Sequence, residues 1–211
     1  MMLTVFGASG RTGRLLVDAA LADGHQVTAV TRRPGAVAVE DRRLRVAVGE
    51  LDDPSFMLGA VADADGVCSV LGSRAPRQAT TLYSGGIDAI LAAMVVSDVR
   101  RIVVVTAIPA EPAEMKSALE RIVIQRLLHA FFGGGYDDMT RMEQRLAASD
   151  RDWTILRPPR LTNASAKGDY RTAIDGRLRR ATSLPRADLA AAMLASVNDQ
   201  TLIRHAVTIA T

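Results

Sequence analysis

Runs of apolar residues alternate with amphipathic segments along most of the chain. Short β-type runs cover residues 3–6, 26–30, 44–48, 66–71, 101–106, 153–156 and 206–209. Apolar residues recur at helical spacing between them, in residues 15–22, 54–61, 80–97, 114–132, 137–148 and 185–197. Because the strand runs are nearly continuously apolar, we expect helices on both faces of a parallel sheet. The pattern predicts an α/β protein with a Rossmann-type doubly wound parallel sheet.

Residues at the ends of the predicted helices support these boundaries. Gly24 can adopt a positive φ without a Cβ clash, so it suits the end of the first helix. Asp52 or Asp53, before the helix that opens at residue 54, is suited to cap it, and Asp137 or Asp138 is a plausible N-cap for residues 137–148. The chain shows no internal repeat and no low-complexity linker. We therefore expect residues 1–211 to form a single domain.

The composition is that of a folded protein without disulfides or metal clusters. Hydrophobic residues make up 48% of the 211 residues, and the formal net charge is +3. Cys68 is the only cysteine, which excludes an intramolecular disulfide and fits a reducing cytoplasm. The three histidines, His25, His129 and His205, are scattered and form no metal-ligand pattern with a single cysteine.

Other bulk features argue against nucleic-acid and membrane partners. The basic residues are 24 arginines and two lysines, Lys116 and Lys167, and they are dispersed without interleaved aromatic residues. Nucleic-acid binding is therefore not expected. No stretch reaches about 18 uncharged apolar residues, so we expect no membrane span. The N-terminus lacks the basic segment of a signal peptide, and we expect a cytoplasmic protein.

A glycine-rich turn joins the first strand to the first helix. Gly7, Gly10 and Gly13 have the spacing G-x-x-G-x-x-G directly after residues 3–6. In a βαβ unit these glycines permit a tight turn, close approach of a pyrophosphate and close helix packing, and the helix N-terminus favours phosphates. The side chains that add donors there are those of Ser9, Arg11 and Thr12. The motif predicts a dinucleotide site, and a glycine-rich turn without a ligand is the alternative.

The end of the second strand bears on the choice of dinucleotide. NAD sites usually place Asp or Glu there to bind the ribose 2′-hydroxyl. Here the strand is followed by Arg32 and Arg33. Arginine forms bidentate, charge-assisted bonds to phosphate. We therefore expect NADP(H) rather than NAD(H), with a solvated arginine pair as the alternative.

Two later strand ends would reach the same ligand, because the strands of a Rossmann sheet end at one edge. The segment after the third strand would lie beside the adenine, where Glu50 is suited to accept a bond from the adenine amino group and Leu51 adjoins it. The segment after the fourth strand, residues 71–74, would pass the phosphate and ribose region.

Seven segments carry a resemblance to a known family. In order they are GASGRTG (7–13), VTAVTRRP (27–34), VGELDD (48–53), LGSR (71–74), VVVTA (103–107), RMEQRLAAS (141–149) and WTILRPPRLT (153–162). With these segments the chain resembles the atypical branch of the short-chain dehydrogenase/reductase superfamily. More narrowly, it resembles the NAD(P)H-binding group that contains the NmrA-like proteins and the biliverdin reductase B/flavin reductases.

The resemblance implies a role for each matched position. Residues 7 and 9–13 would hold the pyrophosphate, Arg32 would meet the 2′-phosphate, and Glu50 and Leu51 would flank the adenine. The positions implied on the path to the nicotinamide and around it are Leu71, Gly72, Arg74, Thr106, Ala107, Pro158 and Pro159. Thr106 is the candidate catalytic residue. The candidates for contact with the electron acceptor are Arg74, Met139 and Arg160, and Arg160 is alternatively a surface or phosphate-binding arginine.

The chain departs from the superfamily on the substrate side. Most members use a Tyr-x-x-x-Lys pair, in which the lysine helps to lower the tyrosine pKa for proton transfer. Four positions after the three tyrosines stand Ile87, Thr140 and Ile174. Ala107 replaces a serine that is usual in biliverdin/flavin reductases, and Met139 and Arg160 replace histidines. Tyrosine–lysine carbonyl chemistry and biliverdin specificity are therefore not expected.

Two functions fit these features. The first is an NADPH-dependent oxidoreductase that transfers hydride to a flavin, quinone or similar planar acceptor, with residues from about 110 to 211 contributing the acceptor side. Such an acceptor takes its proton from water and needs no tyrosine. The second is a non-catalytic NADP(H)-binding redox sensor of NmrA type, which would bind a protein partner. A sugar-nucleotide epimerase or dehydratase is disfavoured by the short chain and the missing pair.

Two further features carry weaker expectations. Residues 127–139 contain Phe131, Phe132 and three glycines. They form either a lid over the acceptor, more mobile than the sheet, or a helix that ends normally at Gly133. Cys68 lies in a predicted core strand, where we expect an inert small hydrophobe rather than a nucleophile. His129 is expected on a helix surface.

Overall fold

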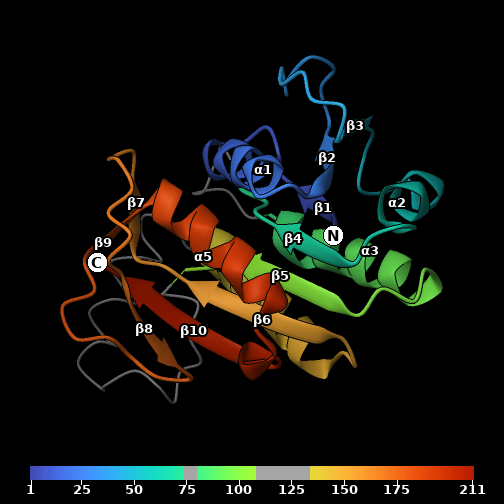
Figure 1. Ribbon diagram of the computed structural model, residues 1–211. Coiled ribbons are helices and arrows are strands. Elements are labelled where there is room, and N and C mark those ends of the chain that lie inside the picture. Colours follow the sequence, from blue (N-terminus) through green and yellow to red (C-terminus); the bar gives the residue numbers. More distant parts are fainter. Residues whose placement is uncertain (74–79, 108–133) are drawn as a thin grey trace.

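An eight-stranded sheet runs through the centre of the molecule (Figure 1). The computed structural model describes residues 1–73, 80–107 and 134–211. The elements of the first half are β1 (Met2–Phe6), α1 (Arg11–Ala22), β2 (Gln26–Thr31), β3 (Leu44–Val48), α2 (Pro54–Val61), β4 (Gly66–Ser69), α3 (Leu82–Val96) and β5 (Arg101–Val105). In the second half residues 134–148 are helical. They are followed by β6 (Asp152–Arg157), β7 (Arg160–Thr162), β8 (Arg171–Ile174), β9 (Ser183–Pro185), α5 (Arg186–Asn198), the 3-10 helix η3 (Gln200–Leu202) and β10 (His205–Ala210).

The described strands pair in parallel except at one edge of this sheet. The order is β3-β2-β1-β4-β5-β6-β10-β8, and β8 joins β10 in the antiparallel direction. The chain moves outward from β1 to β3 and then crosses back to β4, so its direction of growth reverses between β1 and β4. Sheets of this kind bind ligands at such a switch point, outside the carboxyl ends of the strands. The predicted doubly wound parallel sheet is confirmed.

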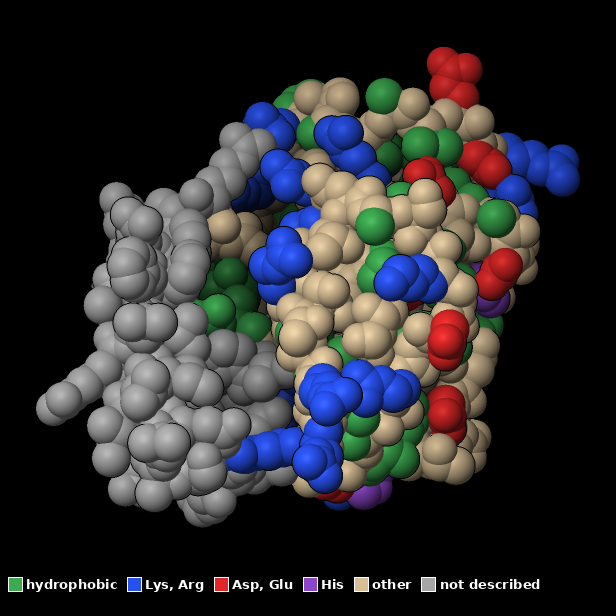
Figure 2. Space-filling model, turned by 90° about the vertical axis from the view of Figure 1, so that its left-hand side faces the viewer, with side chains coloured by type: hydrophobic (Ala, Val, Ile, Leu, Met, Phe, Trp, Pro, Cys, Tyr) green, Lys and Arg blue, Asp and Glu red, His purple; other side chains and the backbone are tan. Residues whose placement is uncertain are grey.

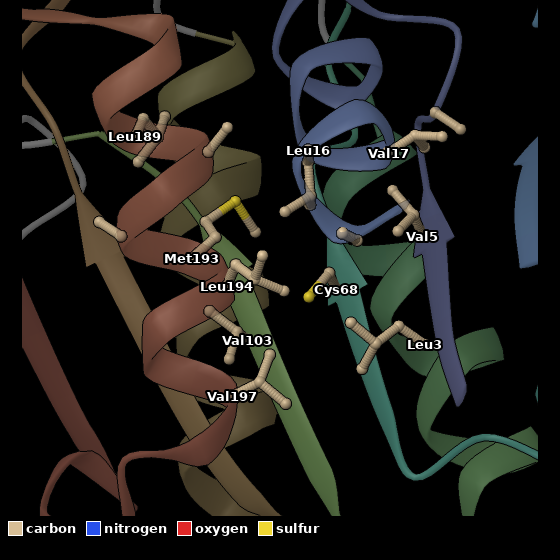
Figure 3. Packing of buried hydrophobic residues seen from close by; sticks show 14 of the residues in the cluster. Leu3, Val5, Leu16, Val17, Cys68, Val103, Leu189, Met193, Leu194 and Val197 are labelled. Atoms are coloured by element: carbon tan, nitrogen blue, oxygen red, sulfur yellow. The ribbon is translucent and has the colours of Figure 1, made fainter. Parts of the chain in front are cut away.

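One face of the sheet is covered by α1 and α5. Figure 3 shows Met193 and Val197 of α5 directed toward Cys68 of β4 and Val103 of β5, with Leu16 of α1 beside them. All five side chains are buried in one hydrophobic cluster. The opposite face is covered by α2, α3 and the helix at residues 134–148, which share a second cluster. Burial on both faces explains why the central strands are continuously apolar.

Local sequence signals place two helix ends correctly. Gly24 follows α1 with a φ of +84° and donates its N–H to the carbonyl of Leu21. Asp53 caps α2, because its carboxylate accepts bonds from the N–H groups of Ser55 and Phe56. None of the helices within the described ranges is both long enough and apolar enough to cross a membrane.

The predicted N-cap at Asp137 or Asp138 is wrong, because residues 134–136 are already helical. The fully buried carboxylate of Asp138 instead accepts bonds from the backbone N–H groups of Tyr83 (2.8 Å) and Ser84 (3.4 Å), in the first turn of α3. The N-cap residue of α3 makes no side-chain cap bond of its own. Asp138 therefore caps a different helix, across a contact that the local sequence does not reveal.

Three short strands of the second half were not predicted. β7 and β9 pair in parallel as a separate two-stranded sheet, and β8 forms the edge of the main sheet. Each has only three or four residues, and most of their positions are partly or fully exposed. Strands this short and polar lack the apolar run on which a prediction from the sequence depends.

Candidate functional site

A pocket of about 1110 Å³ opens at the carboxyl ends of the central strands. Its walls come from the segments after β1, β2, β3, β4 and β5, together with residues near the start of α3 and α5. The face at these strand ends is hollowed, with basic side chains gathered along the border of the hollow (Figure 2). The pocket lies at the switch point of the sheet, where this fold places its ligands.

Most of the predicted site residues meet in this pocket. Those that line it are Gly7, Ser9, Gly10, Arg11, Thr12, Arg32, Arg33, Glu50, Leu51, Leu71, Gly72, Thr106 and Met139. Gly13 lies behind the turn rather than on the pocket surface. Its functional contribution is therefore to the shape of the turn.

The geometry of the turn requires glycine at two positions. Gly7 has a φ of +78°, and a Cβ there would lie 2.6 Å from the carbonyl oxygen of Val70. A Cβ on Gly13 would lie 2.2 Å from the carbonyl oxygen of Gly7 and 2.8 Å from the Cα of Ala8. These are backbone atoms, which cannot rotate away as a flexible side chain does. The glycines thus bring β1, β4 and the start of α1 closer together than any other residue would allow.

The N-terminus of α1 faces this pocket without a side-chain cap. Its N-cap residue is Gly10, which makes no side-chain cap bond. The first N–H groups of a helix have no partner within the helix, and the positive end of the helix dipole lies there. Arg11 and Thr12 of the first turn line the pocket. This turn can therefore bind an anionic group through backbone donors.

The charged groups of the pocket are strongly unbalanced. Four arginines line it, namely Arg11, Arg32, Arg33 and Arg186, whereas Glu50 is the only carboxylate among its described lining residues. Partial burial, and then the positive charge of Arg11, lower the pKa of Arg186 below its ordinary value. A pocket with this charge distribution suits a ligand that carries several negative charges.

Thr106 is held at the pocket by a buried ion pair. Its Oγ1 donates to Oε1 of Glu143 at 2.7 Å, and Arg157 binds the same carboxylate through Nε (3.1 Å) and Nη2 (2.6 Å). Glu143 is 6% exposed and Arg157 is 4% exposed. Because the hydroxyl proton is directed to Glu143, the oxygen of Thr106 can accept a hydrogen bond but has no second proton to donate. The geometry fits a positioning role better than that of a proton donor.

Tyr83 is a pocket residue that the sequence pattern did not indicate. Its hydroxyl oxygen accepts a bond from the N–H of Ser73 at 3.1 Å, which ties α3 to the segment after β4. Burial raises the pKa of Tyr83, the bond from Ser73 opposes that effect, and the charge of Asp138 adds to it. Tyr83 is not followed by a lysine four residues later, so the tyrosine–lysine pattern does not mark it. Its place in the first turn of the helix that follows β4 is the signal that could have found it.

Leu161 and Arg186 are lining residues from the second half that were also not predicted. The arginine predicted for that side, Arg160, is exposed and does not line the pocket. Arg160 begins β7, so its neighbour Leu161 points the other way along the strand. An arginine from the second half does reach the pocket, but from the start of α5.

The remaining predicted residues lie elsewhere. Ala107, Pro158 and Pro159 are not among the lining residues, so their predicted roles stay predictions. Arg74, His129 and residues 127–133 of the predicted lid lie outside the described residues. Cys68 is fully buried, and burial raises the pKa of its thiol to about 12. A thiol that stays protonated and buried is inert at neutral pH, as expected.

Comparison with known proteins identifies the family. A family model described as NAD(P)H-binding matches residues 7–200, which is most of the chain. The chain belongs to this NAD(P)H-binding family. The resemblance to NAD(P)H-binding proteins, which seven sequence segments carried, is thereby confirmed. Among curated proteins, the chain matches 4-hydroxy-tetrahydrodipicolinate reductase from Beijerinckia indica subsp. indica, with 39% identity over 71 residues. That match covers 32% of this chain and only 26% of the relative.

Several solved structures share this fold over the whole of this chain and nearly the whole of their own. An anaerobilin reductase from Escherichia coli O157:H7 has a TM-score of 0.80 at 22% identity, covering 100% of this chain and 97% of that one. A candidate NADH-flavin reductase from Streptococcus pneumoniae TIGR4 has a TM-score of 0.81 at 18% identity, covering 100% and 99%. A short-chain dehydrogenase/reductase from Veillonella parvula, solved with NADP, has a TM-score of 0.80 at 18% identity, covering 100% and 94%. At these identities the likeness shows the fold.

Proposed function

We propose that this NAD(P)H-binding protein is an NADPH-dependent oxidoreductase that reduces a flavin, quinone or similar planar acceptor. The observation that carries the proposal is the pocket at the switch point, where a glycine-built turn and four arginines meet a single carboxylate among the described lining residues. The names of the structural neighbours, which include a flavin reductase candidate and a bilin reductase, support the acceptor class.

The pocket residues fit the chemical groups of NADP(H). The turn around Gly10 would bind the diphosphate through its N–H groups, Arg32 and Arg33 would bind the 2′-phosphate, and Glu50 and Leu51 would flank the adenine. When bound, NADPH supplies the hydride. The chain itself then has to orient two rings and exclude water, which requires no tyrosine acid.

The acceptor side would be contributed by the second half of the chain. Met139 and Leu161 line the pocket there and offer apolar surface to a planar ring. Thr106, held by Glu143, would position the adjoining ring through its hydroxyl oxygen. The chain has no Tyr-x-x-x-Lys sequence, which agrees with an acceptor that takes its proton from water.

The preference for NADP(H) can be tested at Arg32 and Arg33. The double change to glutamine is expected to weaken NADPH binding about 10- to 100-fold and to leave NADH binding nearly unchanged, because a charge-assisted bond to the 2′-phosphate contributes roughly 1.5–3 kcal/mol. Isothermal titration of the four protein–dinucleotide pairs measures this. Arg42→Gln is the matched control, since Arg42 is an exposed arginine that does not line the pocket. Equal losses for both dinucleotides would contradict the assignment.

A redox sensor of NmrA type is the second candidate, because the missing tyrosine–lysine pair fits it as well. Steady-state oxidation of NADPH with FMN, riboflavin and a panel of quinones separates the two functions. We expect acceptor-dependent oxidation with at least one compound. Micromolar or tighter binding of NADP⁺ together with no turnover over the whole panel would favour the sensor.

A further inference from the structure

An arginine from the second half of the chain reaches the same part of the pocket as the glycine turn. Arg186 is the first residue of α5, and it lines the pocket with Gly10, Arg11 and Thr12. The helices α1 and α5 pack side by side on one face of the sheet, so that their first turns approach the pocket from neighbouring positions (Figure 1). Arg186 therefore belongs to the anion-binding end of the pocket as well as to the second half.

Within residues 1–73, 80–107 and 134–211, the hydrogen bonds that hold Arg186 in place all use one nitrogen of its guanidinium. Nη1 donates to Oδ1 of Asn163 at 2.7 Å and to the carbonyl of Leu161 at 3.3 Å. Among the described residues, Nε and Nη2 have no hydrogen-bond partner. In this protein Arg157 binds a carboxylate through that same pair of nitrogens. Arg186 thus keeps open an edge whose geometry suits bidentate binding of a phosphate or carboxylate.

The charges around Arg186 also indicate an anion. Neither Arg186 nor Arg11 forms an ion pair with a carboxylate in the described part of the chain. Partial burial lowers the pKa of Arg186, and the charge of Arg11, which lines the same pocket, lowers it further. Two like charges that face one pocket without a counter-ion are mutually unfavourable, and an anion bound between them removes that cost.

We propose that Arg186 binds the diphosphate of the dinucleotide opposite Arg11, so that the cofactor is held by both halves of the chain. The assignment rests on the cofactor of the proposed function. Four arginines then match four phosphate-borne charges: Arg32 and Arg33 serve the 2′-phosphate, whereas Arg11 and Arg186 serve the diphosphate. Because NAD⁺ and NADP⁺ share the diphosphate, Arg186 binds both equally and plays no part in choosing between them.

Equilibrium binding to Arg186→Gln tests this without any acceptor. Isothermal titration with NADP⁺ and NAD⁺ is expected to show the same 10- to 100-fold loss for both. The fragment 2′,5′-ADP, which lacks the second phosphate of the diphosphate, is expected to lose less affinity than either. Arg179→Gln is the matched control, since Arg179 is an exposed arginine of the second half outside the pocket lining, and it is expected to change none of the three affinities.

Arg186→Lys is a more conservative variant, which distinguishes a loss of dinucleotide affinity from a loss of folding. Lysine retains the positive charge, but its ammonium cannot bind a phosphate in bidentate fashion while it also donates to Asn163. We therefore expect a smaller loss of affinity, again equal for both dinucleotides. Unchanged affinity for both dinucleotides in a folded Arg186→Gln or Arg186→Lys variant overturns the assignment. So does a rise in acceptor KM with unchanged dinucleotide affinity, which would assign Arg186 to an acidic acceptor instead.

The outcomes for Arg186 and for the proposed function can be told apart. A wild-type protein that binds NADP⁺ but reduces no acceptor would refute the reductase and leave the assignment of Arg186 standing, because its readout is binding. A wild-type protein that binds neither dinucleotide would overturn both. Turnover with unchanged dinucleotide binding in Arg186→Gln would support the reductase and remove Arg186 from the diphosphate site.

Discussion

The two walls of the pocket are built in different ways. The first wall is the glycine turn, in which a Cβ on Gly7 or Gly13 would meet main-chain atoms at 2.6 Å or less. The second wall contains Thr106 and Arg186, whose side chains are held by partners far along the chain. Thr106 binds Glu143 across 37 positions, and Arg186 binds Asn163 across 23. A backbone turn is encoded by consecutive residues, whereas a side-chain contact of this kind is encoded by two separate segments.

The largest effect on the second wall is expected from breaking the buried ion pair of Glu143 and Arg157, which holds Thr106. Replacing Arg157 with methionine leaves the carboxylate of Glu143 buried without a compensating charge. We expect the free energy of unfolding in urea to fall by about 3–5 kcal/mol. The double variant Glu143→Leu/Arg157→Met removes both charges and should recover most of that loss. A single variant that loses less than about 1 kcal/mol would show that the pair does not hold this wall together.

The corresponding change in the first wall is Gly13→Ala. Its Cβ would meet the carbonyl oxygen of Gly7 at 2.2 Å, so the turn has to open. We expect a loss of about 3 kcal/mol in urea unfolding, together with loss of measurable NADP⁺ binding by titration.

Gly59→Ala is the control for this change. A Cβ at Gly59, within α2, has no atom within 4 Å, and alanine there should leave stability unchanged or raise it by up to about 1 kcal/mol. If Gly13→Ala bound NADP⁺ as tightly as Gly59→Ala does, the close approach at Gly13 would be unnecessary for the site.

The smallest effects compare a local helix cap with a distant one. Asp53 caps its own helix at an exposed site, so Asp53→Ala should cost about 1 kcal/mol. Asp138 caps α3 from another helix and is fully buried, so Asp138→Ala leaves buried N–H donors without partners and should cost about 2 kcal/mol. Thermal and urea unfolding of the two variants rank them. A larger loss for Asp53→Ala would contradict the view that the distant contact matters more.

These contrasts explain which parts of the molecule were predictable. The glycine turn and Arg32 each directly follow an apolar strand, and parallel strands bring their carboxyl ends to one edge, so the sequence alone placed them in one site. Asp53 was one of two adjacent cap candidates for a similar reason, since a cap and its helix are contiguous. In all these cases the partners lie within a few residues or are brought together by the topology itself.

The parts that were not predicted depend on partners distant in the sequence. Asp138 is a residue type that commonly caps its own helix. Its carboxylate instead accepts bonds from backbone N–H groups at the start of α3, 54 and 55 positions away. Arg160 and Arg186 are both arginines of the second half, and the placement of β7 and α5 decides which one lines the pocket. No pattern within a single segment contains that information, because tertiary packing determines it.

The helix at residues 134–148 carries two residues that support the pocket from behind and one that lines it. Asp138 and Glu143 point inward from it and fix the start of α3 and the end of β5, whereas Met139, between them, lines the pocket. The two residues that stabilise the pocket therefore differ from the residue that a substrate ring would contact. In the proposed reductase, a substitution at position 139 would alter the surface that the acceptor meets without removing the bonds that Asp138 and Glu143 accept. Met139 also packs against the second hydrophobic cluster, so its shape couples the acceptor side of the pocket to the core.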